Sequence, residues 1–350
     1  MRIKVMNPVA PRLYGNLKIH KVSKTNIINA PIRPVVSSVT SPTYLLEKFL
    51  CNTIKCALPS VKTEHSVKNS LDLIKRIEHV TAPPHSSLVS LDVKSLFPSV
   101  NIERTIDIIE EELKQSSNLS ESERAEIKEG LKLVHENNYF QFNNKCYKQV
   151  NGCPMGSPLS PLLSEFYMLQ FEKEIHKLNP NLVNNIVYLH RYVDDILMLW
   201  KGSKRQLDLF LQNANKIYSN FTLELEYGGK EINFLDLNIS IHEGKHRFKI
   251  YRKPSYTDVI IPASSYHMYN HKMAFFRNMY NRVLEVPLER DDFMSELKTI
   301  RNIGENNGYS NYEMKKVFYN TLKNKVEKLL YIPPEMPIQR DTSDFPMLEA

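Results

Sequence analysis

Three aspartates stand where apolar stretches end, and this placement predicts a metal-dependent reaction. Asp92 follows the run SSLVSL, and Asp194–Asp195 separate the apolar runs 186–192 and 196–200. Two carboxylates held about 4 Å apart repel each other by about 4 kcal/mol at an effective dielectric of 20, so a cation must neutralise them or one must be protonated. Mg²⁺ suits such a site, because it binds through one or two carboxylates together with water and substrate phosphates. Two such ions can activate a hydroxyl and stabilise the leaving oxygen of an in-line displacement.

The Asp194–Asp195 pair has a simpler interpretation as the polar tip of a hairpin. Asp is common in turns for reasons of local hydrogen bonding alone. The flanking runs favour the metal site, because they are apolar enough to bury the turn against another part of the chain. A solvated hairpin tip does not need such flanks.

The runs around these aspartates have the composition and alternation of strands. Residues 86–93 predict one buried strand, and 185–200 predict a hairpin with the Asp pair at its turn. Further strands are expected at FTLELEY, INFLDLNISI and HRFKIYRK, with INFLDLNISI as a single strand. Together these strands predict a mostly antiparallel sheet.

Capping residues and helical periodicity place the helices. Ser120 and Glu123 form a capping-box pattern for a helix to about Asn137, and Ser203 can cap a helix to about Asn220. An amphipathic helix is expected over 161–178, with proline tolerated in its first turn. The remaining expected elements are helices at 102–115, 267–285, 291–306 and 310–330, and a hairpin turning at Asn143–Asn144. The middle of the chain is therefore predicted to be α+β, with helices on one face of the sheet, and a helical domain follows it.

The composition indicates the kind of partner and the compartment of the protein. The 350 residues carry 46 Lys+Arg against 39 Asp+Glu, a net charge of +7 that favours a polyanionic partner. The cysteines, Cys51, Cys56, Cys146 and Cys153, form no zinc-type pairs or disulfide framework, which favours a reducing intracellular compartment. No stretch approaches the roughly 20 apolar residues of a membrane span, so no membrane partner is expected.

Six sequence blocks occur in a defined order between residues 11 and 239. They are PRLYGNLKIHK, PIRPVVSS, LDVKSLFPSV, GCPMGSPLSP, YVDD and INFLDLNI. This order resembles the motif order of reverse transcriptases, and the wording is closest to Penelope-like retroelements, which are relatives of the catalytic subunit of telomerase. The resemblance covers roughly residues 11–330.

The resemblance implies a right-hand polymerase fold and an RNA-directed DNA polymerase activity. Fingers are expected at 1–85, a palm at 86–252 with an insertion at about 103–150, a helical thumb at 253–330, and a loose tail at 331–350. The enzyme would transfer nucleotides from dNTPs to the 3′-hydroxyl of a DNA primer on an RNA template, using two Mg²⁺ or Mn²⁺ ions.

The same resemblance assigns roles at the predicted metal site. Asp92 and Asp194 would be the main metal ligands, with Asp195 beside them and the backbone carbonyl of Val93 completing one coordination shell. Phe97 matches the bulky residue that packs against the sugar and rejects the 2′-hydroxyl of a ribonucleotide. As an alternative, Phe97 is simply a core aromatic residue at the start of a helix.

Nucleotide contacts are expected from four further positions. Lys18 and Arg33 resemble finger residues that hold the triphosphate, and the planar guanidinium of Arg33 suits bidentate phosphate binding. Gly156 would allow close approach of the backbone to the incoming nucleotide and template. As an alternative, Lys18 is a solvated surface charge. Lys230 is a candidate general acid for the pyrophosphate leaving group. Many reverse transcriptases carry Gln where this chain has Met155, which leaves the nucleotide contact at that position open.

Primer and duplex contacts are expected further along the chain. Asn233, Phe234 and Leu235 resemble the primer grip, although their alternation equally suits plain sheet packing. Aromatic and basic residues interleave in the helical part and suit a surface that lies along a duplex. They are Tyr266, His267, Tyr269, His271, Lys272, Arg277, Tyr280 and Arg282. The spacing of the two histidines also fits a metal pair, but no HExxH pattern supports zinc.

Three rival functions share the same fold. One is a catalytically idle polymerase fold kept as an RNA-binding scaffold, which the intact acidic positions disfavour. Another is an RNA-templated RNA polymerase, for which a Gly-Asp-Asp motif and a small gate residue are expected where this chain has Val193 and Phe97. The third is a bacterial retroelement enzyme. The sequence shows no GIY-YIG endonuclease motifs, and the resemblance implies nuclear residence.

Overall fold

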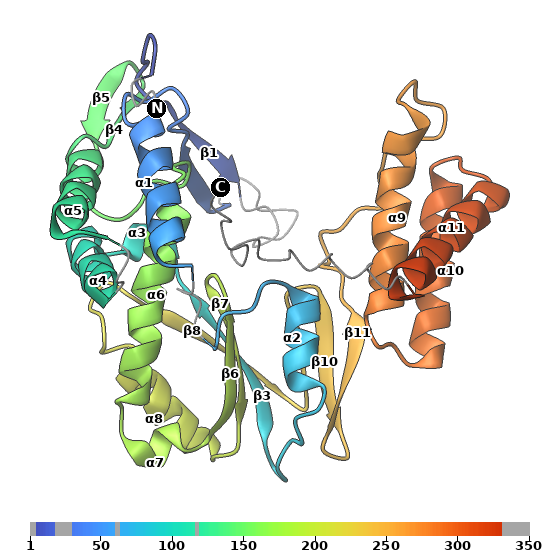
Figure 1. Ribbon diagram of the computed structural model, residues 1–350. Coiled ribbons are helices and arrows are strands. Elements are labelled where there is room, and N and C mark those ends of the chain that lie inside the picture. Colours follow the sequence, from blue (N-terminus) through green and yellow to red (C-terminus); the bar gives the residue numbers. More distant parts are fainter. Residues whose placement is uncertain (1–4, 18–29, 60–63, 116–118, 331–350) are drawn as a thin grey trace, which may run out of the picture. The chain divides into compact units, whose positions relative to one another are not determined.

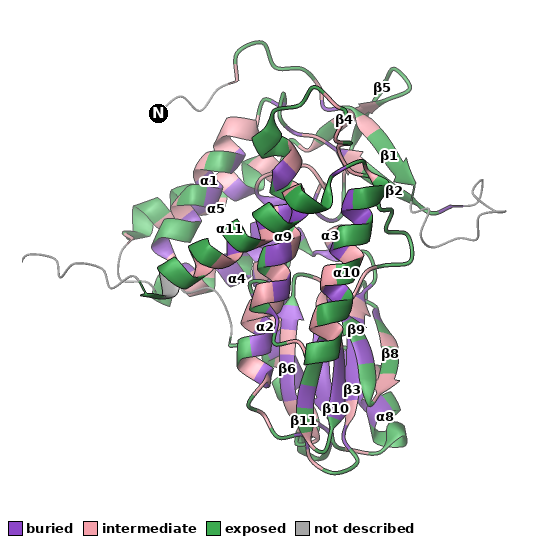
Figure 2. Ribbon diagram, turned by 90° about the vertical axis from the view of Figure 1, so that its right-hand side faces the viewer, coloured by how far each residue is buried: buried purple, intermediate pink, exposed green. Residues whose placement is uncertain are grey.

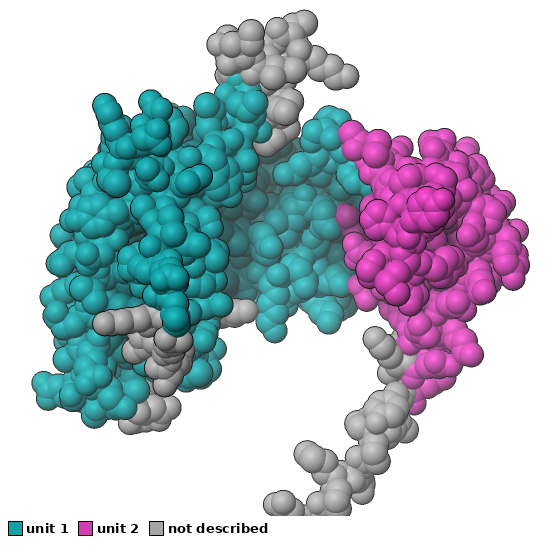
Figure 3. Space-filling view, turned by 90° about the horizontal axis from the view of Figure 1, so that it is seen from above, with its two compact units in different colours: residues 1–256 teal, residues 257–350 magenta. Residues whose placement is uncertain are grey.

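The protein is described from a computed structural model that covers residues 5–17, 30–59, 64–115 and 119–330. The chain forms two compact units, residues 1–256 and 257–350 (Figure 3).

A four-stranded antiparallel sheet lies at the centre of the first unit (Figure 1). Its strands, in spatial order, are β6 (Ile186–Tyr192), β7 (Asp195–Trp200), β3 (Ser87–Val93) and β8 (Leu223–Gly229). The buried strand expected at 86–93 and the hairpin expected at 185–200 are confirmed. β3 is central because its residues are apolar enough to be buried on both faces.

Helices cover one face of this sheet. They are α4 (Ile102–Gln115), α6 (Ser160–His176) and α8 (Lys204–Ala214). Leu91, Met198 and Trp200 share a hydrophobic core with these helices. Leu88 and Leu197 alternate to the other face and are fully buried as well, so both faces of the central strands are covered (Figure 2).

The helix α6 differs from the amphipathic helix expected at 161–178. Eleven of its residues are buried, and they include the polar Ser164 and the charged Glu172. The helix packs against α4 and α3 in addition to its place in the sheet core, so it has only a narrow exposed side. The expected amphipathicity is therefore wrong, while the helix itself is confirmed.

The other elements of the first unit lie around this core. They are α1 (Tyr44–Ala57), α2 (Ser70–Ile77), α3 (Leu96–Ser99), α5 (Glu121–Glu136), α7 (Pro180–Val183), and the two hairpins β1 (Leu13–Leu17) with β2 (Ile32–Val36) and β4 (Tyr139–Phe142) with β5 (Lys145–Lys148). The capping box of Ser120 and Glu123 begins α5 as expected. Ser203 caps α8, but this helix ends at Ala214 and not near Asn220. The turn between β4 and β5 has positive φ at both Asn143 and Asn144, as a tight hairpin requires.

The segment INFLDLNISI forms two strands and not the single strand expected from its alternation. β9 (Glu231–Phe234) and β10 (Leu237–His242) pair with each other, and β11 (Lys245–Ile250) completes a three-stranded sheet. Leu237 lies opposite Phe234, so the chain reverses at Leu235, whose φ is +55°. The Asp236 carbonyl accepts a hydrogen bond from Tyr251 N at 2.9 Å, which fixes the turn beside the end of β11.

In the described part of the second unit, three helices pack on one another. They are α9 (Tyr269–Glu285), α10 (Arg290–Asn306) and α11 (Asn311–Leu330), close to the three expected ranges. Phe276, Ile300 and Ile303 are fully buried between them. Ser310 and Glu313 cap the start of α11 through mutual hydrogen bonds. Within the described residues of both units, no helix has the length and apolar content needed to cross a membrane.

We predict that Phe171→Ala destabilises the first unit by about 3–5 kcal/mol, because it opens a cavity in a fully buried aromatic cluster. Leu209→Ala is the matched control, since Leu209 is 47% exposed on α8, and it should change stability by less than about 0.5 kcal/mol. Urea unfolding is measured through the fluorescence of Trp200, the protein's single tryptophan, which is buried in this unit. Equal effects of the two substitutions would contradict the described core.

Candidate active site

The register between β3 and β7 brings the three aspartates together. Asp92 lies directly opposite Asp195, and Val93 N donates a hydrogen bond to Asp194 O at 3.2 Å. Directly opposed residues of antiparallel strands have their Cβ atoms about 4.5–5.5 Å apart and point to the same face. Residues about 100 positions apart in sequence therefore share one end of the sheet.

The charges of these aspartates act on one another. The pKa of Asp195 is raised to about 6, first by burial and then by the carboxylates of Asp194 and Asp92, whereas Lys253 opposes the shift. All three aspartates are partly buried, so water screens their repulsion only in part. A divalent cation held between them would relieve this repulsion.

The donor set fits Mg²⁺ or Mn²⁺ better than it fits a closed structural metal site. Among the described residues, no group of three His, Cys, Asp or Glu side chains is arranged to hold an ion without other ligands. Mg²⁺ does not require such a cage, because it keeps several waters and takes phosphate oxygens from substrate. Two-metal sites that catalyse displacement at phosphorus use divalent ions in this way. Carboxylates of Asp92 and Asp194, with the nearby Val93 carbonyl, are the groups that would hold them.

The turn that carries the Asp pair is strained. Tyr192 pairs with Asp195, so Val193 and Asp194 form a two-residue turn, and Val193 has a φ of +57°. A β-branched residue is rarely found in this left-handed region, which costs roughly 1–2 kcal/mol for an L-residue. Such strain persists only where the surroundings hold the backbone in place.

A pocket of about 440 Å³ opens beside the aspartates. Asp92 and Asp195 line it together with Asn233, Phe234 and Leu235, the three residues expected in the primer grip. The turn at Leu235 brings them there, although the sequence predicted a continuous strand. The structure therefore brings these five predicted residues together.

Two further residues of this pocket, Tyr251 and Lys253, were missed from the sequence. They follow β11, and only the pairing of β11 with β10 shows that they return to the aspartates. The exposed Lys253 is close enough to oppose the pKa shift of Asp195. It is therefore a cationic group at the edge of the acidic site.

The predicted gate residue Phe97 is held by the loop that follows β5. Phe97 O accepts a hydrogen bond from Cys153 N at 2.7 Å, and the partly buried Phe97 ring packs against the hydrophobic core. Gly152 has a φ of +71° and lies against Pro98, where an added Cβ would come within 2.5 Å of the proline Cα. These backbone contacts hold Phe97, which follows Asp92 by five residues in the chain.

Gly156 requires glycine for a reason that differs from the expected one. The sequence suggested close approach to nucleotide and template. In the structure, a Cβ on Gly156 would lie 2.1 Å from Val36 O and 2.7 Å from Ser37 Cα. The close approach is therefore to the backbone that follows β2, and Gly156 joins the loop before α6 to this segment.

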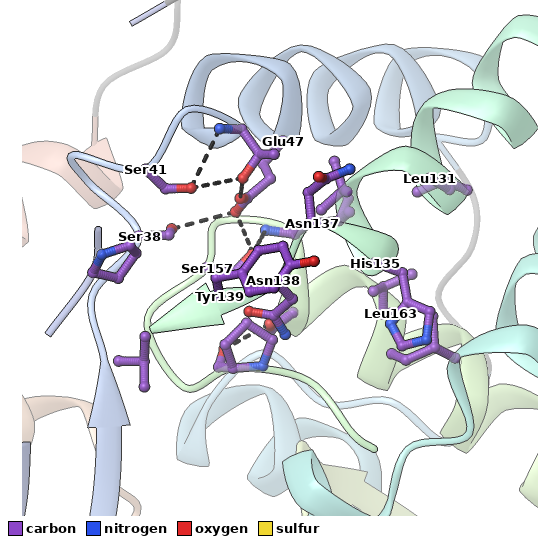
Figure 4. A pocket seen from close by; sticks show the side chains of 18 of the residues that line it. Ser38, Ser41, Glu47, Leu131, His135, Asn137, Asn138, Tyr139, Ser157 and Leu163 are labelled. Carbon is purple, nitrogen blue, oxygen red and sulfur yellow. Dashed lines mark hydrogen bonds between the residues drawn. The ribbon is translucent and has the colours of Figure 1, made fainter. Parts of the chain in front are cut away.

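Glu47 reinforces the same junction and was missed from the sequence (Figure 4). Its carboxylate is 3% exposed and accepts hydrogen bonds from Thr43 at 2.7 Å, Ser157 at 2.5 Å and Ser38 at 3.3 Å. Ser38 also donates to Gly156 O at 3.1 Å. These bonds lie along a cavity of about 40 Å³ between α1 and the loop before α6. They connect the segment after β2 to the loop that holds Phe97.

Lys230 does not lie near the aspartates, and its expected role as general acid is corrected. Gly229 lies opposite Leu88, whereas Glu224 lies opposite Asp92. The four residue steps from Leu88 to Asp92 span roughly 13 Å of strand. Lys230 Nζ instead donates to Ser86 O at 3.2 Å, at the far end of β3.

The remaining expected nucleotide contacts lie in the first unit. Arg33 is exposed on β2, opposite Asn16 and three residues before Val36. Lys18 is outside the described residues.

The expected duplex-contact residues of the second unit are divided between surface and core. Tyr266 and Tyr269 are exposed, as a nucleic-acid contact requires. Tyr280 is only 4% exposed and packs on Phe318, with ring centroids 5.2 Å apart. Tyr280 therefore belongs to the core of this unit, because helical spacing alone does not distinguish the two faces of α9.

Comparison with known structures shows the fold of a right-hand polymerase. Telomerase from Candida albicans, in complex with a fragment of telomeric RNA, superposes with a TM-score of 0.58 and 12% identity, over 92% of this chain and 60% of that one. The RNA-dependent RNA polymerase of a human picobirnavirus gives 0.54 and 11%, over the same shares of the two chains. At these identities the likeness concerns the fold alone.

The sequence shows the family. The model described as reverse transcriptase (RNA-dependent DNA polymerase) matches residues 19–227, which is more than half of the chain. The protein therefore belongs to the reverse transcriptase family. It is also 30% identical over 148 residues to the telomerase reverse transcriptase of Oxytricha trifallax, which covers 37% of this chain and 12% of that protein. The chain thus spans a small part of that curated relative.

A second family model, an animal helix-turn-helix domain, matches residues 259–318. The match contains α9, α10 and the start of α11. The sequence pattern predicts helices for this segment, and the match adds a likeness to a helix-turn-helix domain.

We predict that Glu47→Ala lowers the free energy of unfolding of the first unit by about 2–3 kcal/mol, because buried hydroxyls lose their acceptor. Glu47→Gln keeps one acceptor oxygen and should cost less than about 1 kcal/mol. Urea unfolding followed by Trp200 fluorescence measures both variants. A loss that is the same for Gln and Ala would show that the hydrogen bonds to Glu47 do not join the two segments.

Proposed function

We propose that the protein is the RNA-directed DNA polymerase of a Penelope-like retroelement. The reaction is transfer of a nucleotide from a dNTP to the 3′-hydroxyl of a DNA primer on an RNA template. The observation that carries the proposal is the register that sets Asp92 against Asp195 and Asp194, within a chain of the reverse transcriptase family. The six ordered sequence blocks support the Penelope-like subtype, and nuclear residence follows from that subtype.

Asp92 and Asp194 would hold two Mg²⁺ or Mn²⁺ ions, with Val93 O as a further ligand and Asp195 adding negative charge beside them. When bound, the ions lower the pKa of the primer hydroxyl and stabilise the leaving oxygen. The protein contributes chiefly by orienting the reactants and balancing charge. Burial and the neighbouring carboxylates raise the pKa of Asp195, and a bound cation would offset this accumulation of negative charge.

Residues around the metal site position the substrates. Asn233, Phe234 and Leu235 line the pocket beside the aspartates, which suits a grip on the primer terminus. Phe97, fixed by Cys153, faces the sugar and excludes a 2′-hydroxyl. Arg33, together with Lys18, binds the triphosphate of the incoming nucleotide.

The subdomains are assigned to match these roles. Fingers take residues 1–85, the palm 86–252 with an insertion at 103–150, the thumb 253–330, and the tail 331–350. The thumb holds the duplex of RNA template and DNA primer through exposed aromatic and basic residues. Its similarity to a helix-turn-helix domain supports a surface that contacts a duplex.

We predict that Asp194→Asn lowers primer extension on an RNA template by about 1,000-fold or more, because a ligand of the ions is lost. The assay uses purified protein, dNTPs, and Mg²⁺ or Mn²⁺. Asp208→Asn is the matched control, since Asp208 is an exposed aspartate on α8. Primer extension by Asp194→Asn at the wild-type rate would contradict the proposed mechanism.

We predict that Phe97→Ala reduces the preference for dNTPs over NTPs by about 10- to 100-fold, because the bulk beside the sugar is removed. The measurement is the ratio of kcat/KM for dGTP and GTP on the same primer and template. Wild-type protein that prefers GTP would favour an RNA polymerase. An unchanged ratio in Phe97→Ala would assign Phe97 to the core alone.

A further inference from the structure

Arg191 lies on β6 three residues before Asp194, and its side chain is completely buried. Its guanidinium binds two carboxylates of α6. Nη1 and Nη2 donate to the two oxygens of Glu165 at 3.1 and 3.0 Å, and Nε donates to Glu172. This bidentate pairing fixes the plane of the guanidinium relative to α6.

The same guanidinium also holds the catalytic turn. Nη1 donates to Val193 O at 3.1 Å. Val193 is the residue with a φ of +57°, and its carbonyl carbon is bonded to the nitrogen of Asp194. Arg191 thus joins the fully packed helix α6 to the strained peptide that carries Asp194.

The backbone of Arg191 is fixed as well. Its N donates to His65 O at 2.7 Å, and its carbonyl accepts from Val67 N at 2.8 Å. Ser66 Oγ donates to Glu165 at 3.1 Å, so the segment before α2 supports both the strand and the carboxylate. β6 is the outer strand of its sheet, and these bonds hold the side of it that faces away from β7.

Stability alone is a poor explanation for this cluster. Buried ion pairs often contribute no more stability than apolar side chains of the same volume, because desolvation offsets their attraction. The pairing here is also incomplete, since Glu172 Oε2 is buried without a hydrogen-bond partner among the described residues. Three apolar side chains in place of Arg191, Glu165 and Glu172 would not supply a hydrogen-bond donor to Val193 O.

We propose that Arg191 is a positioning residue that holds the Val193–Asp194 turn, and thereby sets the Asp194 carboxylate beside Asp92. It acts through Val193 O and does not touch the reacting atoms. The inference rests on the polymerase function proposed above. Lysine at this position keeps one charge but lacks the forked donors needed to reach two carboxylates and a carbonyl together.

The test begins with Arg191→Lys, and Arg205→Lys on exposed α8 is the matched control. We expect Arg191→Lys to lower kcat for dNTP addition by about 10- to 100-fold, because a misplaced carboxylate weakens the reactive geometry. KM for dNTP and affinity for primer–template should stay within about twofold of wild type, since those contacts lie elsewhere. Burst amplitudes count the active molecules, so a loss confined to the active fraction would overturn the proposal.

A second substitution separates positioning from general destabilisation. Glycine adopts the φ of +57° without strain, so Val193→Gly in the Arg191→Lys background should restore kcat by about tenfold. If the double variant instead loses kcat by the combined effect of the two single substitutions, the proposal is overturned. If Trp200 fluorescence shows that Arg191→Lys does not fold, Glu165→Gln carries the same test, because Glu165 is only partly buried and its amide form loses the charge.

Direct Mn²⁺ titration by electron paramagnetic resonance gives a readout that does not need activity. Arg191→Lys should weaken Mn²⁺ binding several-fold, because the carboxylate of Asp194 is displaced from its position as a ligand. Val193→Gly in the Arg191→Lys background should restore the Mn²⁺ affinity. Unchanged Mn²⁺ affinity in Arg191→Lys overturns the positioning role. If wild-type protein binds Mn²⁺ but extends no primer, the proposed function fails while the Mn²⁺ comparison still decides the role of Arg191.

Discussion

The repulsion between carboxylates at one end of the central sheet is the constraint around which the rest of the structure is arranged. Pairing of β3 with β7 sets Asp92 against Asp195, and burial raises the pKa of Asp195 to about 6. Without a bound cation this proximity is unfavourable, because like charges at a partly buried site repel each other strongly. It persists because the apolar residues of the same strands are buried on both faces of the sheet. The favourable burial of the strands therefore offsets the unfavourable meeting of the charges.

Segments outside the sheet hold this end of the molecule in shape by a different means, buried hydrogen bonds. Glu47 joins the segment after β2 to the loop before α6, and Gly156 lets the two backbones meet. The same loop fixes Phe97 through Cys153. Arg191 in turn connects α6 to the strained turn at Val193. A reaction that depends on placing charged reactants within a few tenths of an ångström benefits from such rigid supports.

The sequence predicted those parts of the fold that local pattern determines. Apolar runs ending in aspartate located β3 and the β6–β7 hairpin, since strand alternation and turn chemistry are local properties. The break at Leu235 was missed because Leu235 itself fits the apolar alternation of the residues that follow it up to Ile241. Glu47 was missed because α1 was not predicted. Lys230 was placed wrongly because its distance from Asp92 depends on strand register, which the sequence does not specify. Long-range pairing thus decided what the local pattern left open.

Iron-mediated cleavage tests most directly whether Asp92 and Asp194 share bound cations. Fe²⁺ bound in place of Mg²⁺, with ascorbate and peroxide, generates hydroxyl radicals that cut the backbone near its ligands. The account predicts two cuts in the same molecules, next to residue 92 and next to residues 193–195, both suppressed by excess Mg²⁺ and both lost in Asp92→Asn. Cleavage at only one of the two positions, or cleavage that persists after Asp92→Asn, would contradict a shared site.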